Sequence, residues 1–350
     1  MSMRVPLVWM LRGPKAGDYA QLQLIARAMN VPATTKQLVF KPWELLLHAF
    51  PKPTLAGLDR SRSDALEAPW PDLVLTAGRR NELVACWIRA ASGNHSRIVH
   101  VGRPWSNPRR FDLVVSNRQY LLDDGDNVIV NDLPLTDLTE STLAPERAVW
   151  GAKWASLPHP WTVVLVGGDS GPLVLTPKWA RELADRINAR KDRDGGSILV
   201  STSGRTPPAS ADVLLQTLKG PQFIYRWPSS DPNPFRGMLA CGDEFVVTGD
   251  SMSMLAEASA TGKPVYLFDY SDAGLTLSTL RWKPLVHRLA MSIGPVRMRR
   301  DVGRIHAALV QAGRVRPLQQ VPDGPAKVPS EQTSDDLART VQRVRALLER

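Results

Sequence analysis

The stretch Val246-Val-Thr-Gly-Asp-Ser-Met-Ser-Met-Leu-Ala-Glu-Ala-Ser-Ala-Thr-Gly-Lys-Pro-Val-Tyr-Leu-Phe268 carries the clearest pattern in the sequence. An apolar run ends at Thr248, a short polar turn follows, and apolar residues then recur at helical spacing as far as Gly262. Lys263 and Pro264 lead into a second apolar run. A buried strand, a helix and another buried strand in that order predict a parallel sheet that is covered by helices.

The same alternation of short apolar runs and helical spacing continues along the whole chain. In the first half it predicts strands at residues 5–11, 36–40, 73–76, 97–101, 113–116 and 127–130, with helices at 18–29 and 81–91. Asp18 is expected to cap the first of these helices. In the second half it predicts strands at 161–166, 197–201, 244–248 and 264–268, with helices at 177–190, 211–219 and 252–261.

A chain of 350 residues is long for a single hydrophobic core, so two domains are expected. A connector that contains Trp, Pro and His interrupts the alternation near residues 150–160. We place an N-terminal Rossmann-like acceptor domain at 1–155, a C-terminal Rossmann-like donor domain at 156–316, and a linker with an amphipathic helix at 317–350. Two doubly wound α/β domains that face a cleft, followed by a late helix, are the plan of the GT-B fold, which other two-domain proteins share.

The chain carries 44 Lys and Arg against 34 Asp and Glu, which gives a net charge of +10. The basic residues are scattered and no nucleic-acid-binding signature occurs, so we expect no nucleic-acid partner. Cys86 and Cys241 stand far apart in sequence, as in a reducing compartment. Because we find no signal peptide and no apolar run of ~18 residues, we expect a cytoplasmic protein. A basic cluster could still touch an anionic membrane from its inner face, although a solvated charge run is the alternative: Arg297, Arg299, Arg300 and Arg304.

The polar turn after Thr248 predicts an anion site, because free N–H groups and the positive end of the helix dipole meet there. We expect the turn and the start of the helix to hold a diphosphate: Asp250, Ser251, Met252 and Ser253. Glu257 lies one turn beyond Ser253 on the same helix face, so its carboxylate could accept hydrogen bonds from both ribose hydroxyls. The alternative is that Glu257 is a solvated helix residue and that the turn only caps the helix.

Two further turns follow predicted strands of the second half, where ligands bind in doubly wound sheets. The first is rich in glycine and could face the same diphosphate: Gly167, Gly168, Asp169 and Ser170. The second offers Ser203 and Arg205, whose cation could neutralise the departing diphosphate, although a plain surface arginine is equally compatible. Trp227 lies where the base of a nucleotide would be expected, and could equally fill the core.

The segment 246–268 resembles the nucleotide-sugar signature of GT-B transferases such as the lipid-linked N-acetylglucosaminyltransferase of peptidoglycan synthesis. The whole chain resembles more closely the bacterial branch of the "elongated mitochondria" fission-protein family. The matching stretches span both halves: Val8-Trp-Met-Leu, Lys15-Ala-Gly-Asp18 with Gln21, Ala77-Gly-Arg-Arg80, Gly102-Arg-Pro104, Phe111-Asp-Leu-Val-Val115, Val166-Gly-Gly-Asp169, Ser201-Thr-Ser203 and Asp250-Ser-Met-Ser253. The plant members of the family are linked to mitochondrial division, and the bacterial members look like sugar transferases.

The resemblance also suggests roles in the first half. The turn before Asp18 is similar to the Gly-rich loop of GT-B acceptor domains, where the peptidoglycan enzyme has a His, so Asp18 is a candidate base. An ordinary helix cap is the commoner role for an Asp at such a position. Arg79 and Arg80 follow a predicted strand and could hold an acidic acceptor or the donor phosphates. Arg103 is a weaker candidate of the same kind.

We therefore expect a GT-B glycosyltransferase that moves a sugar from a nucleotide-sugar donor to a hydroxyl on a cell-envelope glycan or a lipid-linked acceptor. No metal and no cofactor are expected, because the Asp124-Gly-Asp126 and Asp192-Arg-Asp194 motifs lie in turns where aspartates are common. One alternative is a non-catalytic adaptor that keeps the GT-B fold and recruits partners. Another is a nucleotide-sugar epimerase, which would need acids on both sides of the sugar.

Overall fold

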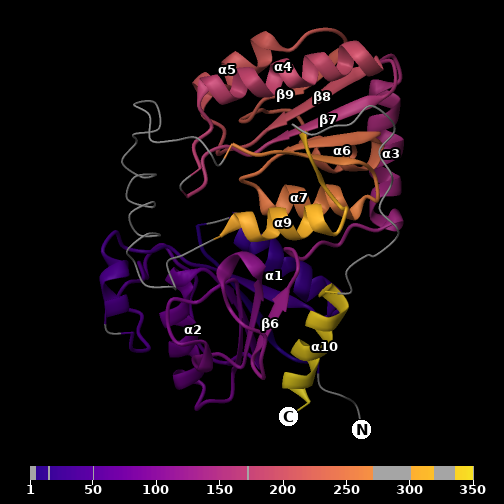
Figure 1. The fold of residues 1–350 in the computed structure, drawn as a ribbon. Helices are drawn as coiled ribbons and strands as arrows, with labels where there is room; N and C mark the ends of the chain where they lie inside the picture. Colours follow the sequence, from indigo (N-terminus) through magenta and orange to yellow (C-terminus); the bar gives the residue numbers. More distant parts are fainter. Residues whose placement is uncertain are drawn as a thin grey trace. The chain divides into compact units, whose positions relative to one another are not determined.

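The computed structural model describes residues 5–14, 16–49, 51–171, 173–270, 301–318 and 336–349 (Figure 1). These residues form two compact units. The first comprises the described part of Met1–Thr136, Asp301 and the C-terminal helix, and the second comprises the described part of Asp137–Gly294 and Val302–Thr333.

The first unit contains a parallel sheet with the strand order β2-β1-β3-β4-β5-β6, six strands among the residues described. The strands are β1 (Val8–Arg12), β2 (Ala33–Gln37), β3 (Leu73–Ala77), β4 (Arg97–Val101), β5 (Leu113–Asn117) and β6 (Val128–Asn131). Its helices are α1 (Ala16–Ala28), α2 (Arg79–Ala91) and α10 (Asp336–Leu348), with the short 3₁₀ helices η1 (Glu44–Ala49), η2 (Pro108–Arg110) and η3 (Arg118–Tyr120).

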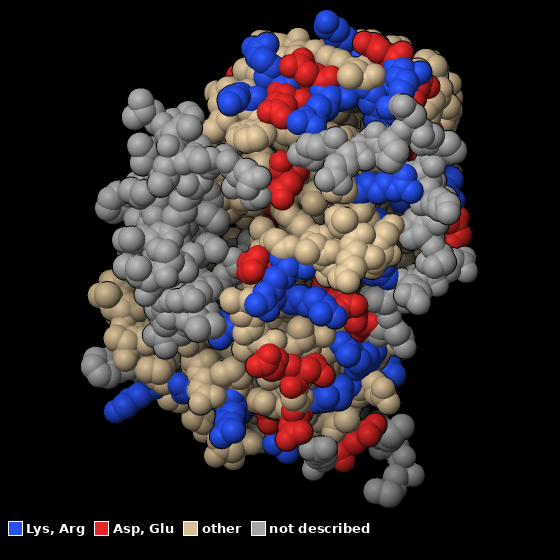
Figure 2. Space-filling model, viewed as in Figure 1, with Lys and Arg blue, Asp and Glu red and all other residues tan. Residues whose placement is uncertain are grey.

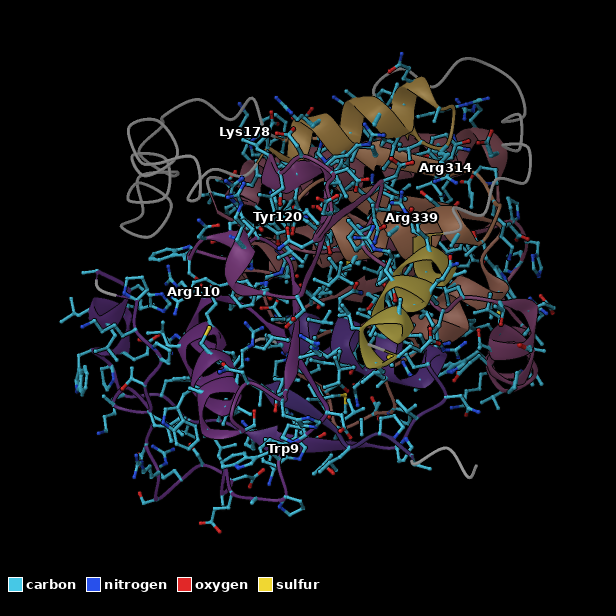
Figure 3. All side chains as sticks on the ribbon, turned by 90° about the horizontal axis from the view of Figure 1, so that it is seen from below. Trp9, Arg110, Tyr120, Lys178, Arg314 and Arg339 are labelled. Atoms are coloured by element: carbon cyan, nitrogen blue, oxygen red, sulfur yellow. The ribbon has the colours of Figure 1, made fainter. Side chains whose placement is uncertain are left out.

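Apolar side chains that alternate along these strands divide the unit into two cores. On one face Val8, Met10 and Leu75 pack with Ile25 of α1 and Val344 of α10. On the other face the core holds strand residues and α2 residues, among them Trp9, Val74, Val84 and Ile88. Helix α10 is further tied to the end of β6, because the guanidinium of Arg339 (Figure 3) donates to the Val130 carbonyl at 3.0 Å and to Asn131 Oδ1 at 2.9 Å.

The second unit contains a parallel sheet with the strand order β12-β11-β10-β7-β8-β9, again six strands among the residues described. The strands are β7 (Trp161–Val166), β8 (Ser197–Thr202), β9 (Gln222–Tyr225), β10 (Glu244–Thr248), β11 (Val265–Phe268) and β12 (Arg316–Pro317). Its helices are α3 (Glu140–Trp154), α4 (Pro177–Asp194), α5 (Pro208–Thr217), α6 (Phe235–Cys241), α7 (Met252–Ala260) and α9 (Val302–Gln311). The predicted α/β fold with two Rossmann-like, doubly wound parallel sheets is confirmed.

Each sheet has a topological switch point, because the strands that follow its first strand are added on one side of it and later on the other side. In the first unit the chain runs from β1 to β2 on one side and then places β3 on the other side of β1. In the second unit it runs from β7 through β8 to β9 and then places β10 on the other side of β7. Ligands of doubly wound proteins bind beyond the carboxyl ends of the strands at such points.

Several local expectations differ from the structure. Helix α4 runs to Asp194 rather than ending at 190, so the Asp192-Arg-Asp194 motif lies in a helix and not in a turn. Strand β2 ends at Gln37 rather than running over 36–40, since Phe40 turns away and pairs with Leu58 in an antiparallel bridge. Helix α1 begins at Ala16, so Asp18 lies inside its first turn and is not its N-cap. Helix α3, which we placed in the N-terminal domain, groups with the second unit, where Trp150 and Trp154 pack against Phe223 of β9.

The excess of basic residues is not gathered on the face shown in Figure 2, where Lys and Arg are interspersed with Asp and Glu. Of the basic cluster expected near a membrane, Arg297, Arg299 and Arg300 lie outside the described residues. In the ranges that the structure describes, no helix is both long enough and apolar enough to cross a membrane.

Candidate functional site

The turns after β7 and β10 are joined at the switch point of the second unit. The Gly167 N–H donates to Thr248 Oγ1 at 2.8 Å, and the Gly168 N–H donates to Asp250 Oδ2 at 3.0 Å. A Cβ atom at Gly167 would lie 2.2 Å from Asp250 Oδ2, so any side chain there would displace the Asp250 carboxylate. The sequence-predicted residues on these two turns are therefore brought together.

The turn after β8 closes on the same glycines. Thr206 Oγ1 donates to the Gly167 carbonyl at 2.7 Å, and the hydroxyl of Ser203 donates to that carbonyl as well. The Asp169 N–H donates to the Arg205 carbonyl at 3.0 Å. At Gly168, with φ of +134°, a Cβ atom would lie 2.1 Å from the Arg205 carbonyl oxygen. Three turns from three strands thus form one packed platform.

This packing uses the main-chain donors of the Gly-rich turn. The N–H groups of Gly167, Gly168 and Asp169 bond as described above, and the N–H of Ser170 donates to the Leu173 carbonyl at 3.0 Å. These N–H groups are therefore engaged within the protein. The glycines allow three turns to approach closely.

Asp250 is a second residue whose place differs from its expected role. Its side chain is 1% exposed, and it is held between the Gly168 N–H and Arg205 Nη1, which lies 2.7 Å from Asp250 Oδ2. A buried carboxylate in these contacts does not face an anionic ligand. The Arg205 side chain remains 41% exposed, so its guanidinium can bind a further anion beside Asp250.

Helix α7 begins beside this platform. Ser251 precedes the helix in an extended conformation, and its side chain forms no capping hydrogen bond. The N–H groups in the first turn of any α-helix have no acceptor within that helix. Met252 is 3% exposed and belongs to the core, while Ser253 is exposed. The donors available to an anion here are therefore main-chain N–H groups and the Ser253 hydroxyl, together with the helix dipole.

Glu257 lies half-buried on α7, about one turn beyond Ser253. Burial raises the pKa of Glu257 to about 7, Arg236 opposes that rise, and Asp137 adds to it. Arg236 in turn pairs with Asp137, with Nη1 at 3.3 Å from Oδ1. None of the residues that the structure describes forms a hydrogen bond to the Glu257 carboxylate, which leaves its oxygens available to hydroxyl groups.

Two residues complete the surroundings of the platform. His306 of α9 is 5% exposed, with Nε2 at 2.8 Å from the Gly249 carbonyl oxygen and Nδ1 at 3.5 Å from Asp269 Oδ2. Sequence reasoning missed it, because α9 comes about 57 residues after the turn it supports and no motif marks it. Trp227 follows β9, and 48% of its surface is exposed. Its main-chain N–H donates to Thr202 Oγ1 at 2.8 Å. Trp227 therefore does not fill the core.

The switch point of the first unit holds Asp18. The Gly78 residue that precedes α2 has φ of +73°, and a Cβ atom there would lie 2.9 Å from Asp18 Oδ2. Asn81 joins the two strands at this point, since its Nδ2 donates to the Leu11 carbonyl at 2.9 Å and to the Ala77 carbonyl at 3.1 Å. Asp18 is thus placed where a ligand of this unit is expected.

The three arginines of the first unit have different surroundings. Arg80 pairs with Glu44, which is 3% exposed, at 2.9 Å between Nε and Oε1. Arg103 donates to the carbonyls of Tyr120 (Figure 3) and Leu121, the latter at 2.8 Å. Arg79 stacks over the Trp105 ring at 4.3 Å from its centroid, and burial lowers the pKa of the Arg79 guanidinium. Within the described residues, Arg79 is the one of the three whose guanidinium forms neither a hydrogen bond nor an ion pair.

Buried polar residues that the sequence did not reveal fix this arrangement. Glu82, which is fully buried, accepts hydrogen bonds from the N–H groups of Trp105 at 2.7 Å and Ser106 at 2.9 Å, and so holds the turn that carries Arg103. His100 is also fully buried, with Nε2 at 3.9 Å from Glu82, and burial lowers the pKa of its imidazole. Among the described residues, no three His, Cys, Asp or Glu side chains gather as metal ligands would.

The sequence profile described as "Mitochondrial fission ELM1" matches residues 16–348 of this chain. The chain belongs to the mitochondrial fission ELM1 family. The match covers all the candidate residues, and it confirms the family resemblance stated from the sequence.

Two relatives of this ELM1-family chain are similar over long stretches. The mitochondrial fission protein ELM1 of Arabidopsis thaliana is 29% identical over an alignment of 233 residues that covers 60% of this chain and 54% of the plant protein. The chain thus spans about half the length of that relative. The uncharacterized protein RP120 of Rickettsia prowazekii is 23% identical over an alignment of 301 residues that covers 75% of this chain and 82% of the relative.

Solved structures are similar at lower identity. A UDP-GlcNAc 2-epimerase from Neisseria meningitidis bound to UDP-GlcNAc aligns over 97% of this chain and 99% of its own, with a TM-score of 0.49 and 12% identity. A UDP-glucosyltransferase from Polygonum tinctorium aligns over 100% of both chains, with a TM-score of 0.48 and 11% identity.

Proposed function

We propose that this ELM1-family chain is a metal-independent glycosyltransferase that takes its sugar from a nucleotide-sugar donor. The observation that carries the proposal is the switch point of the second unit, where three packed turns meet the start of α7. One turn farther along the same helix stands Glu257, a carboxylate without a hydrogen-bond partner among the described residues. This arrangement offers an anion site and a hydroxyl-binding carboxylate on one helix.

The contacts that we propose for the nucleotide-sugar donor use the groups that are not already bonded within the platform. The diphosphate would be bound by the N–H groups at the start of α7, the Ser253 hydroxyl and the Arg205 guanidinium. Glu257 would accept hydrogen bonds from the ribose hydroxyls when it is ionised. The exposed ring of Trp227 would stack on the base of the nucleotide.

The chemistry asked of these groups is a displacement at the anomeric carbon of the donor sugar. The oxygen of the acceptor hydroxyl forms a bond to that carbon, the bond to the nucleoside diphosphate breaks, and the hydroxyl proton passes to a base. Asp18 is the proposed base in the first unit, and a base of this kind contributes about 10²–10⁴-fold. Arg205 and the helix dipole would stabilise the negative charge that develops on the leaving diphosphate.

For the acceptor we propose a hydroxyl on a cell-envelope glycan or a lipid-linked sugar. Arg79 is the most suitable of the three arginines for an acidic group on this acceptor, because Arg80 and Arg103 already bind protein groups.

A second candidate is a non-catalytic adaptor that keeps the fold and recruits partners. Two observations favour it: the name of the plant relative refers to mitochondrial fission, and the N–H groups of the Gly-rich turn bond within the protein. An adaptor has no need for a hydroxyl-binding carboxylate at Glu257, so nucleotide binding separates the two functions.

The test is a calorimetric titration of the full chain with UDP, GDP, CMP and ADP. We expect one nucleotide to bind, and Glu257→Ala to weaken its binding by about 10-fold or more, as for lost hydrogen bonds to a charged group. Glu182→Ala is the matched control, since it removes a carboxylate from α4 that pairs only with Arg186 of the same helix among the described residues. If the folded protein binds none of the four, the transferase proposal fails and the adaptor is favoured.

A further inference from the structure

One buried histidine joins the turn after β10 to a helix that comes later in the chain. His306 lies on α9, and the same helix buries Ile305 and Leu309. Figure 1 shows α9 beside α7, and the His306 ring reaches the turn that precedes α7. Its Nε2 atom lies 2.8 Å from the Gly249 carbonyl oxygen, and the residue is 5% exposed. The ring is therefore enclosed between α9 and this turn.

The direction of this hydrogen bond follows from its two partners. A carbonyl oxygen can only accept, so His306 Nε2 carries the hydrogen and donates it to Gly249. The other ring nitrogen, Nδ1, lies 3.5 Å from Asp269 Oδ2, and an N–H···O hydrogen bond measures about 2.7–3.2 Å. Of the two contacts, the one with the Gly249 carbonyl is thus the hydrogen bond.

Gly249 is a residue whose orientation depends on such a contact. Its N–H donates to the Phe268 carbonyl at 2.9 Å, which ties one side of the residue to the end of β11. A Cβ atom at Gly249 would lie 2.9 Å from His306 Cε1, so the lack of a side chain lets the ring come this close. Glycine also leaves the main chain more conformational freedom than other residues do. The hydrogen bond from His306 therefore restrains a peptide unit that glycine alone would leave loosely held.

The restrained peptide unit leads directly into α7. The Gly249 carbonyl and the Asp250 N–H belong to one planar trans unit, so they point in opposite directions. Because the carbonyl faces His306, the Asp250 N–H faces away from it. Ser251 follows, and the Leu255 N–H donates to the Ser251 carbonyl at 3.1 Å as the helix begins. A rotation of this one peptide unit would therefore change the direction in which the chain enters α7.

We propose that His306 is a positioning residue of the nucleotide-sugar site, which holds the Gly249 carbonyl and so keeps the N–H groups at the start of α7 aimed at the diphosphate. The inference rests on the proposed function, because the diphosphate is the ligand that these N–H groups would bind. The buried ring acts through the turn and needs no contact with the ligand. Without its hydrogen bond the turn would sample other directions, and a site that is not preorganised binds its ligand less tightly.

The experiment compares two substitutions of His306 by calorimetric titration of the full chain with UDP, GDP, CMP and ADP. His306→Leu is apolar and has no donor, so we expect the nucleotide that the wild type binds to bind about 10-fold less tightly. His306→Gln can offer an amide N–H to the Gly249 carbonyl, so its affinity should stay within about 3-fold of the wild type. A side chain that only fills the core would show the opposite order, because Leu is the better apolar filler.

Amide hydrogen exchange of the same variants measures the positioning without any ligand. We expect the amides of residues 249–253 to exchange about 10-fold faster in His306→Leu than in the wild type or in His306→Gln, while those of β7 and β8 change less. Asn188→Leu is the matched control, since Asn188 Nδ2 donates to the Thr217 carbonyl at 2.9 Å, shortly before β9 and so at the amino ends of the strands. This control should unfold at a lower temperature, with nucleotide affinity and the exchange of residues 249–253 unchanged.

The positioning role is overturned if His306→Leu binds the nucleotide as tightly as the wild type, or if His306→Gln loses as much affinity as His306→Leu. If the wild type binds none of the four nucleotides, the proposed function fails and hydrogen exchange decides the positioning role. Equal protection of residues 249–253 in the wild type and in His306→Leu would then overturn it as well. If His306→Leu does not fold, His306→Asn replaces it in both measurements, because the Asn side chain is polar but one methylene shorter than that of Gln.

Discussion

The guanidinium of Arg205 lies 2.7 Å from the carboxylate of Asp250, which is almost fully buried. The pair joins the turn after β8 to the turn after β10, and Gly168 completes it by donating its N–H to the same carboxylate at 3.0 Å. The arrangement explains why an acidic residue stands at a switch point that we expect to bind an anion. Asp250 organises the turns, and the exposed part of Arg205 remains for the ligand.

This role of Asp250 makes the glycine beside it sensitive to substitution. Gly167→Ala would bring a Cβ atom to 2.2 Å from Asp250 Oδ2, so a shift of the platform is required. We expect the free energy of unfolding in urea to fall by about 1–3 kcal/mol. Gly17→Ala is the control, because a Cβ atom there meets nothing within 4 Å and the residue lies in α1. Equal stability of the two variants would contradict the packing described.

The raised pKa of Glu257 predicts that nucleotide affinity depends on pH. Because its pKa is about 7 in the folded protein, it is largely protonated at pH 6 and ionised at pH 8. Only the ionised carboxylate accepts two hydrogen bonds from ribose hydroxyls, so affinity should rise as the pH rises through 7. In Glu257→Gln this rise should disappear. Titrations with the nucleotide at several pH values check it, and a wild-type affinity that is flat across this range would contradict the ribose assignment.

The raised pKa of Glu257 also predicts that the stability of the fold falls as the pH rises, opposite to the trend in nucleotide affinity. Its folded-state pKa is raised from the ordinary 4.5, so between pH 4.5 and about 7 the folded state holds a proton that the unfolded state has released. The free energy of unfolding therefore falls as the pH rises through this window, by ~3 kcal/mol at most. Above pH 7 the loss is complete. Glu257→Gln, compared with the wild type in urea at pH 5 and pH 8, should remove this part of the pH dependence.

The positions of the candidate residues could largely be predicted from the sequence, because ligands of parallel sheets bind where strands end. Gly167, Ser203 and Asp250 each follow an apolar run, and the structure brings their turns together. Glu257 could be placed on α7 by counting from Ser253, since helical periodicity fixes neighbours one turn apart.

What each residue binds could not be predicted in the same way. Whether the N–H of a turn residue is free depends on contacts from distant segments. Here the Gly168 N–H donates to the Asp250 carboxylate, and the Asp169 N–H donates to the Arg205 carbonyl. His306 reaches Gly249 from a helix far along the chain, and Arg80 finds its carboxylate at Glu44 in an irregular connection. Such pairings follow from tertiary packing and leave no local pattern in the sequence.

The two adjacent arginines at the start of α2 should respond differently to removal. Arg80→Ala would leave Glu44 buried without its cation, so we expect the free energy of unfolding to fall by about 1–3 kcal/mol. Arg79→Ala removes only a stack on Trp105, for which about 0.5–1 kcal/mol is expected. Urea unfolding of the two variants side by side measures the difference. A larger loss for Arg79→Ala would show that the Glu44 pair contributes little.

Asp18 provides the sharpest test of the catalytic part of the proposal. It stands inside the first turn of α1, where a carboxylate interacts favourably with the helix dipole but holds no cap, so Asp18→Asn should lower stability by no more than ~1 kcal/mol. If Asp18 is the base, the variant should lose about 10²–10⁴-fold in turnover, followed as nucleoside diphosphate released from the nucleotide sugar in the presence of acceptor. Its affinity for the nucleotide itself should not change, because those contacts lie in the second unit. Asp64→Asn is a suitable control, since Asp64 is an exposed carboxylate that accepts from the Gln37 N–H. Full turnover in Asp18→Asn would exclude Asp18 as the base, while a loss of nucleotide affinity in the same variant would show that its effect does not arise at the acceptor hydroxyl.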